Sequence, residues 1–138
     1  MIIDRRMQVS ALQALTATAR STDVIDLGQA SRIIGPGDPL WWVIVARTGL
    51  GGTTPTLDIA VQTDDNAAFA SAATLLSHPQ LAAAGFTTGT RIVIPMPWSN
   101  ERYLSLLYTL GGTSPTATVD AFLTNQDPAS WRAFPDAI

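Results

Sequence analysis

Few side chains in this sequence could do chemistry, and their spacing gives them little support. The 138 residues include one histidine, His78, and no cysteine. A histidine acts as a general base or metal ligand only beside suitable partners, and no acidic residue is close to His78 in the sequence. We expect His78, which precedes a proline, to lie in a loop. The only glutamate, Glu101, lies in "SNER" at the start of a strand, where we expect a turn hydrogen bond or a pair with Arg102.

The run "TDDN" (63–66) is the second place where oxygen ligands gather. It lacks the alternating ligands and the closing glutamate of a calcium-binding loop. Aspartate and asparagine also form turns by accepting hydrogen bonds from nearby backbone, and we favour a turn here. No glycine pair is followed by the lysine of a phosphate-binding loop, and no Gly-x-Ser-x-Gly elbow occurs. The sequence therefore predicts no enzyme, no metal site and no cofactor.

The charge balance limits the class of partner. Lysine and arginine total 8, aspartate and glutamate total 11, and the net charge is −3. An acidic chain with few charges is a poor candidate for direct nucleic-acid binding. The longest apolar run, "LWWVIVA" (40–46), is too short to cross a membrane, and "MIIDRRMQVS" places two arginines where a signal peptide would be apolar. We expect a single domain that folds in a reducing cytoplasm.

The elements that would position these residues are strands, because apolar and polar residues alternate along most of the chain. About seven such segments, separated by turns rich in glycine and proline, predict an all-β fold: an antiparallel β-sandwich or barrel. "LWWVIVAR" is apolar on both faces and should be a central strand. The predicted inward faces are Leu57, Ile59 and Val61; Ile92, Ile94 and Met96; Leu104, Leu106 and Tyr108; and Ala117, Val119, Ala121 and Leu123.

Helix is expected to be minor. The stretch "DDNAAFASAATLL" could begin a short helix at Asp65 or Asn66. The stretch "HPQLAAAG" resembles one helical turn between Pro79 and Gly85. Either segment could instead be an irregular loop.

Two connectors are almost the same: "LGGTTPT" at 50–56 and "LGGTSPT" at 110–116, which differ only at Thr54 and Ser114. Each lies between two alternating segments. We therefore expect two antiparallel hairpins, joining 40–47 to 56–63 and 102–110 to 116–124. Either the same turn was needed twice, or both loops project from the body and contact a partner.

Apolar residues at both ends of the chain also need an explanation. The first ten residues alternate apolar residues with charge, and the tail from 125 to 138 shows no clear strand or helix. Apolar ends of this kind either fold back on their own body or dock on a partner. The residues concerned are Ile2, Ile3, Met7, Trp131, Phe134 and Ile138.

Four stretches, taken in order, resemble the small cement or decoration proteins of short-tailed phage capsids, of the Bordetella-phage type. They are "ALQALTATARSTDVIDLG" (11–28), "LDIAVQTDDNAAFASA" (57–72), "NERYLSLLYT" (100–109) and "TVDAFLT" (118–124). The resemblance implies a jelly-roll-like antiparallel β-sandwich of about seven to eight strands. Around the body (11–124) we expect an extended N-terminal arm (1–10) and a C-terminal tail (125–138).

The resemblance also implies a function. Such a protein is a structural component of the virion, without enzyme activity or cofactor, that is made in the host cytoplasm and sits on the outer surface of the capsid. It would bind the major capsid protein, bridge neighbouring subunits, and associate with itself as a homodimer. It would contact neither membrane nor nucleic acid. The candidate contact residues are Ile2, Ile3, Arg5, Arg6, Gly51, Gly52, Gly111, Gly112, Trp131 and Phe134.

A carbohydrate-binding jelly roll of a phage tail or surface adhesin is the alternative. In such a module, exposed tryptophans stack on sugar rings. Trp41 and Trp42 discriminate between the two, because they fall on opposite faces of one strand and at least one should be in the core. If both are packed by protein, that strand offers no sugar platform.

Overall fold

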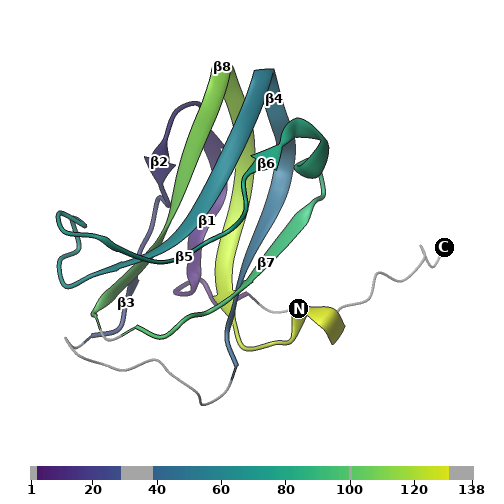
Figure 1. The fold of residues 1–138 in the computed structure, drawn as a ribbon. Helices are drawn as coiled ribbons and strands as arrows, with labels where there is room; N and C mark the ends of the chain where they lie inside the picture. Colours follow the sequence, from purple (N-terminus) through teal and green to yellow (C-terminus); the bar gives the residue numbers. More distant parts are fainter. Residues whose placement is uncertain (1–2, 29–38, 100, 131–138) are drawn as a thin grey trace.

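The chain folds into strands joined by loops (Figure 1). The computed structural model describes residues 3–28, 39–99 and 101–130. Eight strands and no α-helix among these residues confirm the all-β prediction. In order, the elements are β1 (Gln8–Leu15), β2 (Ala19–Arg20), β3 (Ile25–Asp26), β4 (Trp41–Asp64), β5 (Ala73–Ser77), β6 (Leu81–Ala82), the 3-10 turn η1 (Ala83–Gly85), β7 (Arg91–Pro95), β8 (Tyr103–Thr124) and the 3-10 turn η2 (Pro128–Ser130).

Two long strands dominate the fold. β4 has 24 residues and β8 has 22, and they pair with each other in antiparallel register from end to end. Trp41 lies opposite Thr124, and Asp64 lies opposite Tyr103. The two near-identical connectors lie in the middle of these strands, where the register shifts and the ribbon folds over. The prediction of two hairpins is therefore wrong, because each half-strand pairs with the other long strand and not with its own second half.

The fold-over explains why the connector occurs twice. Hydrogen bonds hold neighbouring strands about 4.8 Å apart, so two paired strands that cross one fold must bend together. Bends and bulges are the usual means by which a strand passes from one sheet of a sandwich to the other. Since β4 and β8 cross the fold side by side, both need the same backbone geometry. We call residues 50–56 and 110–116 together the corner.

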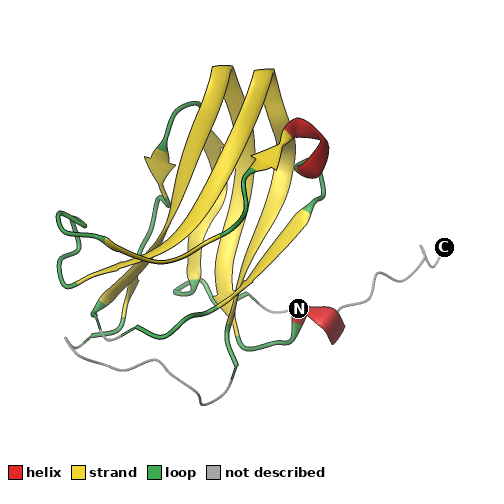
Figure 2. Cartoon of the chain, in the orientation of Figure 1, coloured by secondary structure: helices red, strands yellow, loops and turns green. Residues whose placement is uncertain are grey.

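The fold-over produces the two layers of a β-sandwich (Figure 2). One layer contains β7, the first half of β4, the second half of β8, and β1. The other contains β5 and β6, the second half of β4, the first half of β8, and β2 and β3. All these pairs are antiparallel and belong to one hydrogen-bonded sheet. The predicted antiparallel β-sandwich is confirmed.

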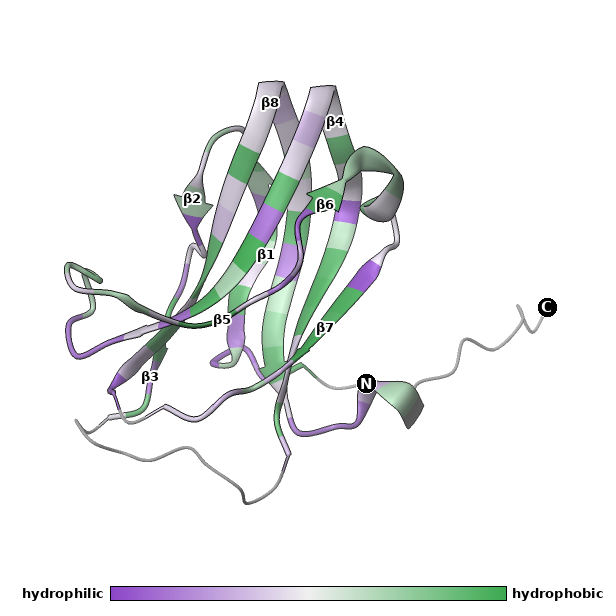
Figure 3. Ribbon diagram, in the orientation of Figure 1, coloured by the Kyte–Doolittle hydropathy of each residue, from purple (hydrophilic) through white to green (hydrophobic). Residues whose placement is uncertain are grey.

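The core lies between the layers and follows the predicted alternation (Figure 3). Trp42 is fully buried, so one of the paired tryptophans is in the core as expected. Each fully buried Leu, Ile or Val side chain stabilises the fold by about 1.5–3 kcal/mol relative to exposure. The predicted inward faces are confirmed: Leu57, Ile59, Val61, Ile94, Leu104, Leu106, Tyr108, Ala117, Val119, Ala121 and Leu123 are buried, and Ile92 and Met96 pack against them.

The two segments with helical spacing form little helix. Residues 65–72 are a loop, so the loop alternative holds there. The carboxylate of Asp64 accepts hydrogen bonds from the backbone N–H groups of Asn66 and Ser71, each at 2.9 Å, and this favours a turn over a helix. The second segment is a short strand, β6, followed by one 3-10 turn that ends at Gly85 as predicted. Within the described ranges, no helix is long and apolar enough to cross a membrane.

Candidate interaction surfaces

The corner has internal two-fold symmetry. Thr53 pairs with Thr113, and these two residues hold the same place in the two copies of the motif. On either side of this pair, Gly51 lies opposite Thr116 and Thr56 lies opposite Gly111, which is the same pairing seen from each strand. A pseudo-two-fold axis therefore passes between the two copies. It also exchanges the two layers, whose strands follow the same order.

Glycine at two positions allows the copies to approach each other. Gly52 and Gly112 both have left-handed backbone, with φ of +115° and +95°. A Cβ atom on Gly52 would lie 2.8 Å from the carbonyl oxygen of Ser114, and one on Gly112 would lie 2.6 Å from that of Thr54. Cβ atoms do not approach backbone oxygens so closely, so any side chain there would push the strands apart. These predicted contact glycines, although exposed, thus set how closely the two strands approach at the corner.

The outer side of the corner presents hydroxyl groups and no charge. Thr53, Thr54, Thr113 and Ser114 are all exposed, and no charged residue occurs within 50–56 or 110–116. Thr54 and Ser114 have φ of +46° and +49°, a left-handed conformation that side-chain-bearing residues seldom adopt. An exposed, uncharged and conformationally fixed surface suits contact with another protein.

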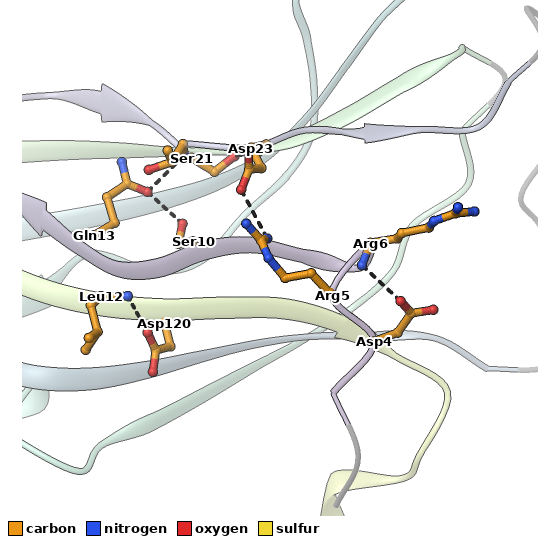
Figure 4. A network of polar contacts seen from close by, with 10 residues as sticks. Asp4, Arg5, Arg6, Ser10, Leu12, Gln13, Ser21, Asp23 and Asp120 are labelled. Atoms are coloured by element: carbon orange, nitrogen blue, oxygen red, sulfur yellow. Dashed lines mark hydrogen bonds and ion pairs between the residues drawn. The ribbon is translucent and has the colours of Figure 1, made fainter.

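The predicted N-terminal arm is partly folded onto its own body (Figure 4). Residues 4–7 form a turn in which Met7 N–H donates to the carbonyl oxygen of Asp4 at 2.9 Å. Leu123 N–H donates to the carbonyl oxygen of Met7 at 2.9 Å, and the Met7 side chain packs against the core. β1 then begins at Gln8, so the arm ends earlier than residue 10. The prediction of an extended arm over 1–10 is wrong for residues 4–10.

The candidate contact residues of the arm differ in how they are held. Arg5 forms an ion pair with Asp23 at 3.3 Å, and both side chains remain at least half exposed, so the pair contributes little to stability. The Arg6 N–H donates to the Asp4 carboxylate, while its side chain is exposed. Ile3 is 40% exposed. Ile2, Trp131 and Phe134 lie outside the described residues.

An apolar cavity of about 310 Å³ lies beside the arm. It is at the end of the sandwich opposite the corner, where β4 begins and β8 finishes. Asp4, Asn125 and Gln126 supply polar groups at its rim. Its apolar lining includes Ile3, Met7, Ile25, Leu27, Leu40 and Leu123. The sandwich thus has two unlike ends, one uncharged and hydroxyl-rich, the other apolar and concave.

One exposed residue that the sequence did not single out is held in a strained conformation. Leu12 has φ of +48° and is 63% exposed, at an irregularity in the pairing of β1 with β8. Its N–H donates to the Asp120 carboxylate at 2.5 Å (Figure 4). Asp120 also pairs with Arg47 at 3.4 Å. The hydrogen bond to Asp120 therefore stabilises the strained backbone conformation of Leu12. Leu12 is a further candidate contact residue, because strained residues cluster at functional sites.

The side chains that could do chemistry do not lie together in the structure. The His78 ring Nδ1 lies 2.7 Å from the carbonyl oxygen of the following proline, as expected of a loop residue. Glu101 N–H lies 3.4 Å from the Ser99 Oγ, which bears out a turn hydrogen bond. The alternative pair with Arg102 is wrong, since Arg102 binds Asp26. No group of three or more metal-ligating side chains occurs in the described part of the chain.

Arg102 and Asp26 form a two-pronged ion pair on the surface. Arg102 Nε and Nη2 donate to the two carboxylate oxygens of Asp26 at 2.7 and 2.8 Å. These hydrogen bonds, helped by the N–H of Gly28, lower the pKa of Asp26 to about 2. The pair joins β3 to the start of β8 and fixes one edge of the second layer.

The three tryptophans that the structure describes do not share one exposed face. Trp42 is fully buried and donates its indole N–H toward the Met96 sulfur, while Trp41 is partly buried beside Val93 and η2. Trp98 is 66% exposed, and it lies after β7 rather than on the Trp41 strand. The strand that carries the tryptophan pair therefore offers at most one partly accessible ring.

Comparison with known proteins agrees with the phage resemblance at a coarse level. Residues 9–123 match the protein family described as Bbp16, a family of Bordetella phage proteins. The match runs from the start of β1 to the end of β8 and so includes both halves of the corner. No curated protein matches the chain.

Proposed function

Because the chain belongs to the Bbp16 family of Bordetella phage proteins, we propose that it is a capsid cement, or decoration, protein. It is made in the host cytoplasm, binds the outside of the phage head, contacts the major capsid protein, and bridges neighbouring subunits of the shell. It associates with itself as a homodimer. It needs no catalytic group or cofactor, since its task is to hold other proteins together.

The observation that supports this proposal most directly is the separation of two unlike exposed ends. A bridging protein must touch two neighbours at once. Nine residues of strand, 41–49, lead from Trp41 to the corner, which at about 3.3 Å per residue is roughly 30 Å. The corner and the apolar cavity are therefore far enough apart to meet different subunits. Two weak contacts joined by a rigid body bind much more tightly than either alone.

The core supplies the rigidity. β4 and β8 pair in both layers, so a pull along the sandwich loads the backbone hydrogen bonds between them on either side of the register shifts at 46–56. Between the layers, the Tyr108 hydroxyl lies 2.9 Å from Ser10 Oγ, and both groups are fully buried. This contact joins β1 in one layer to β8 in the other. A body that resists shear and separation suits a shell under outward pressure from packaged DNA.

The first test is occupancy. Purified virions should contain this protein in a fixed ratio to the major capsid protein, and heads made without it should rupture at lower temperature or under milder osmotic shock. The protein found only free in lysate, with heads equally robust in its absence, would rule out a cement role. Sedimentation of the pure protein tests the homodimer, and a glycan array tests the carbohydrate-binding alternative.

A second test concerns the arm. Deletion of residues 1–7 would test the whole arm, but it would also remove Met7 and its hydrogen bond with Leu123. Ile3→Asp is cleaner, because Ile3 is partly exposed and lies on the cavity wall. We expect weaker binding to heads with an unchanged thermal midpoint. Ala70→Asp, which adds the same charge on the exposed loop 65–72 away from the cavity, is the matched control for a general charge effect.

A further inference from the structure

We propose that two copies of this chain pair through the outer edge of β7, with Val93 facing Val93 of the second copy across a two-fold axis. The inference rests on the homodimer of the proposed function and deepens it, since it names the strand and the register through which the copies meet.

β7 is the most regular outer strand of the sandwich within the described ranges. β1 and β5, the longer strands at other edges, pair with their neighbours through register shifts. β2, β3 and β6 have only two residues each. The five residues of β7 pair with β4 without a shift, and no second strand pairs with them. A regular edge of this kind is a template for a further strand.

The hydrogen bonds to β4 show which backbone groups of β7 point outward. Met96 N–H donates to the carbonyl oxygen of Leu40 at 2.8 Å. Ala46 N–H donates to that of Thr90, also at 2.8 Å and in the same register. Opposed pairs in an antiparallel ladder alternate between hydrogen-bonded and non-hydrogen-bonded, so the N–H and C=O of Val93 point away from β4. Among the described residues neither group has a partner, and a further strand would satisfy both.

The side chains of β7 fit a second copy of the same strand. In a two-fold pair centred on Val93, this residue lies opposite itself, and two backbone hydrogen bonds form between the copies. Val93 is 37% exposed, so two apolar side chains meet on the outer face. Ile92 then lies opposite Ile94 of the second copy, and both belong to the apolar inner face. That inner face would continue from one copy into the other.

Pro95 favours this register over its neighbours. Proline has no N–H, so a pairing centred on Pro95 would lose its central hydrogen bonds. Centring on Val93 leaves Pro95 at the margin, where its carbonyl oxygen can still accept. Closed dimers use the same patch on both subunits, and β7 is complementary to itself in this register. Trp98, which is 66% exposed and follows β7, extends the apolar surface beside the edge.

A charge exchange at the centre tests the inference. Val93→Lys and Val93→Asp each place like charges opposite one another, so each variant alone should dimerise at least about 10-fold more weakly. An equal mixture of the two variants pairs unlike charges and should restore association to within about 3-fold of the unaltered protein. Leu76→Lys, at a residue 38% exposed on β5, is the matched control and should dimerise normally. Sedimentation equilibrium measures association, and thermal midpoints check that each variant folds.

Val93→Pro gives a second test without charge. It removes the outward N–H and leaves the hydrogen bonds between β7 and β4 intact, so the folded variant should also dimerise at least about 10-fold more weakly. Ser77→Pro, the same change at an exposed position of the β5 edge, should have no effect on association.

The outcomes separate the two proposals. If a folded Val93 variant dimerises as tightly as the unaltered protein, or the charged mixture stays as weak as each variant alone, the β7 pairing is wrong and the cement function stands. A protein that is monomeric at every concentration overturns the inference and the homodimer. If that monomer binds heads and Val93→Pro does not, the edge takes a strand of the shell instead. Failure of the unaltered protein to bind heads ends the cement function, while sedimentation still decides the β7 pairing.

Discussion

Thr53 lies directly opposite Thr113 in the ladder between β4 and β8, and each is the fourth residue of its copy of the motif. When two copies of one sequence pair in antiparallel register, only one residue lies opposite its own equivalent, and the other positions pair symmetrically around it. The two copies therefore serve as two halves of one structural device. A substitution that shifts the backbone of one copy should also shift the other copy, because the two backbones are in contact.

Gly52→Ala and Gly112→Ala should both be strongly destabilising, by about 3 kcal/mol or more, through overpacking and a strained φ. Gly89→Ala is the control: its φ is +86°, but nothing lies within 4 Å of an added Cβ, so only the cost of about 1 kcal/mol for φ should remain. Urea unfolding measures all three. Equal losses at Gly89 and Gly112 would show that the close approach carries no energy.

The buried contact between Tyr108 and Ser10 should respond unequally to removal of its two partners. Tyr108→Phe removes one buried hydroxyl, while Ser10 Oγ keeps Gln13 at 2.7 Å, so we expect a loss of about 1 kcal/mol. Ser10→Ala leaves the Tyr108 hydroxyl buried without a partner and should cost about 1–3 kcal/mol. Urea unfolding of both single variants and the double variant checks this. A smaller loss for Ser10→Ala than for Tyr108→Phe would contradict it.

The same tyrosine gives a prediction for alkaline pH. Burial raises the pKa of Tyr108, so its hydroxyl stays neutral in the folded chain where an unfolded tyrosine ionises, at about pH 10. The unfolded chain then binds fewer protons, and stability should fall as pH rises above about 10. Tyr108→Phe should fall less steeply over that range. Parallel curves for the two proteins would show that Tyr108 does not contribute.

The inward faces could be read from the sequence, because alternation depends only on which residues avoid water. Leu57, Ile59 and Val61 needed no knowledge of their strand neighbours. The pairing of the strands could not be read in this way. A glycine-rich connector between two alternating segments suits a hairpin and a folded-over strand equally well, since both bury the same faces. The choice depends on a partner some 60 residues away.

Some candidate contact residues could likewise be read from the sequence pattern, and others could not. Glycines 51, 52, 111 and 112 stood out in the sequence because the motif repeats, and the structure gathers them at one corner. Leu12 did not stand out, because a positive φ runs against the preference of leucine. Its conformation depends on Asp120, which is distant in sequence. The local sequence around Leu12 carries no information about a hydrogen bond to so distant a residue.

The Asp26–Arg102 pair predicts a response to acid. With a pKa of about 2 when folded and about 3.9 when unfolded, Asp26 contributes stability above about pH 4 that is lost as pH falls through 2. Arg102→Gln removes the main cause of the lowered pKa, although the Gly28 N–H remains. Carboxyl NMR should place Asp26 near 2 in the unaltered protein and higher in the variant. An unchanged Asp26 titration in the variant would show that Arg102 does not hold it.

The strained Leu12 allows fold and function to be separated. An ordinary leucine-to-glycine change in a strand destabilises, but here glycine removes a left-handed strain of about 1–2 kcal/mol, and little buried surface is lost. We therefore expect Leu12→Gly to unfold at the same or a higher urea concentration. Asp120→Ala, which removes the acceptor of the Leu12 N–H, should unfold at a lower urea concentration.

If Leu12 contacts the shell, Leu12→Gly will nevertheless bind heads more weakly, whereas exposed Ala11→Gly, its neighbour, will not. Normal head binding by Leu12→Gly would remove Leu12 from the contact surface and leave its strain a feature of the β1 edge alone.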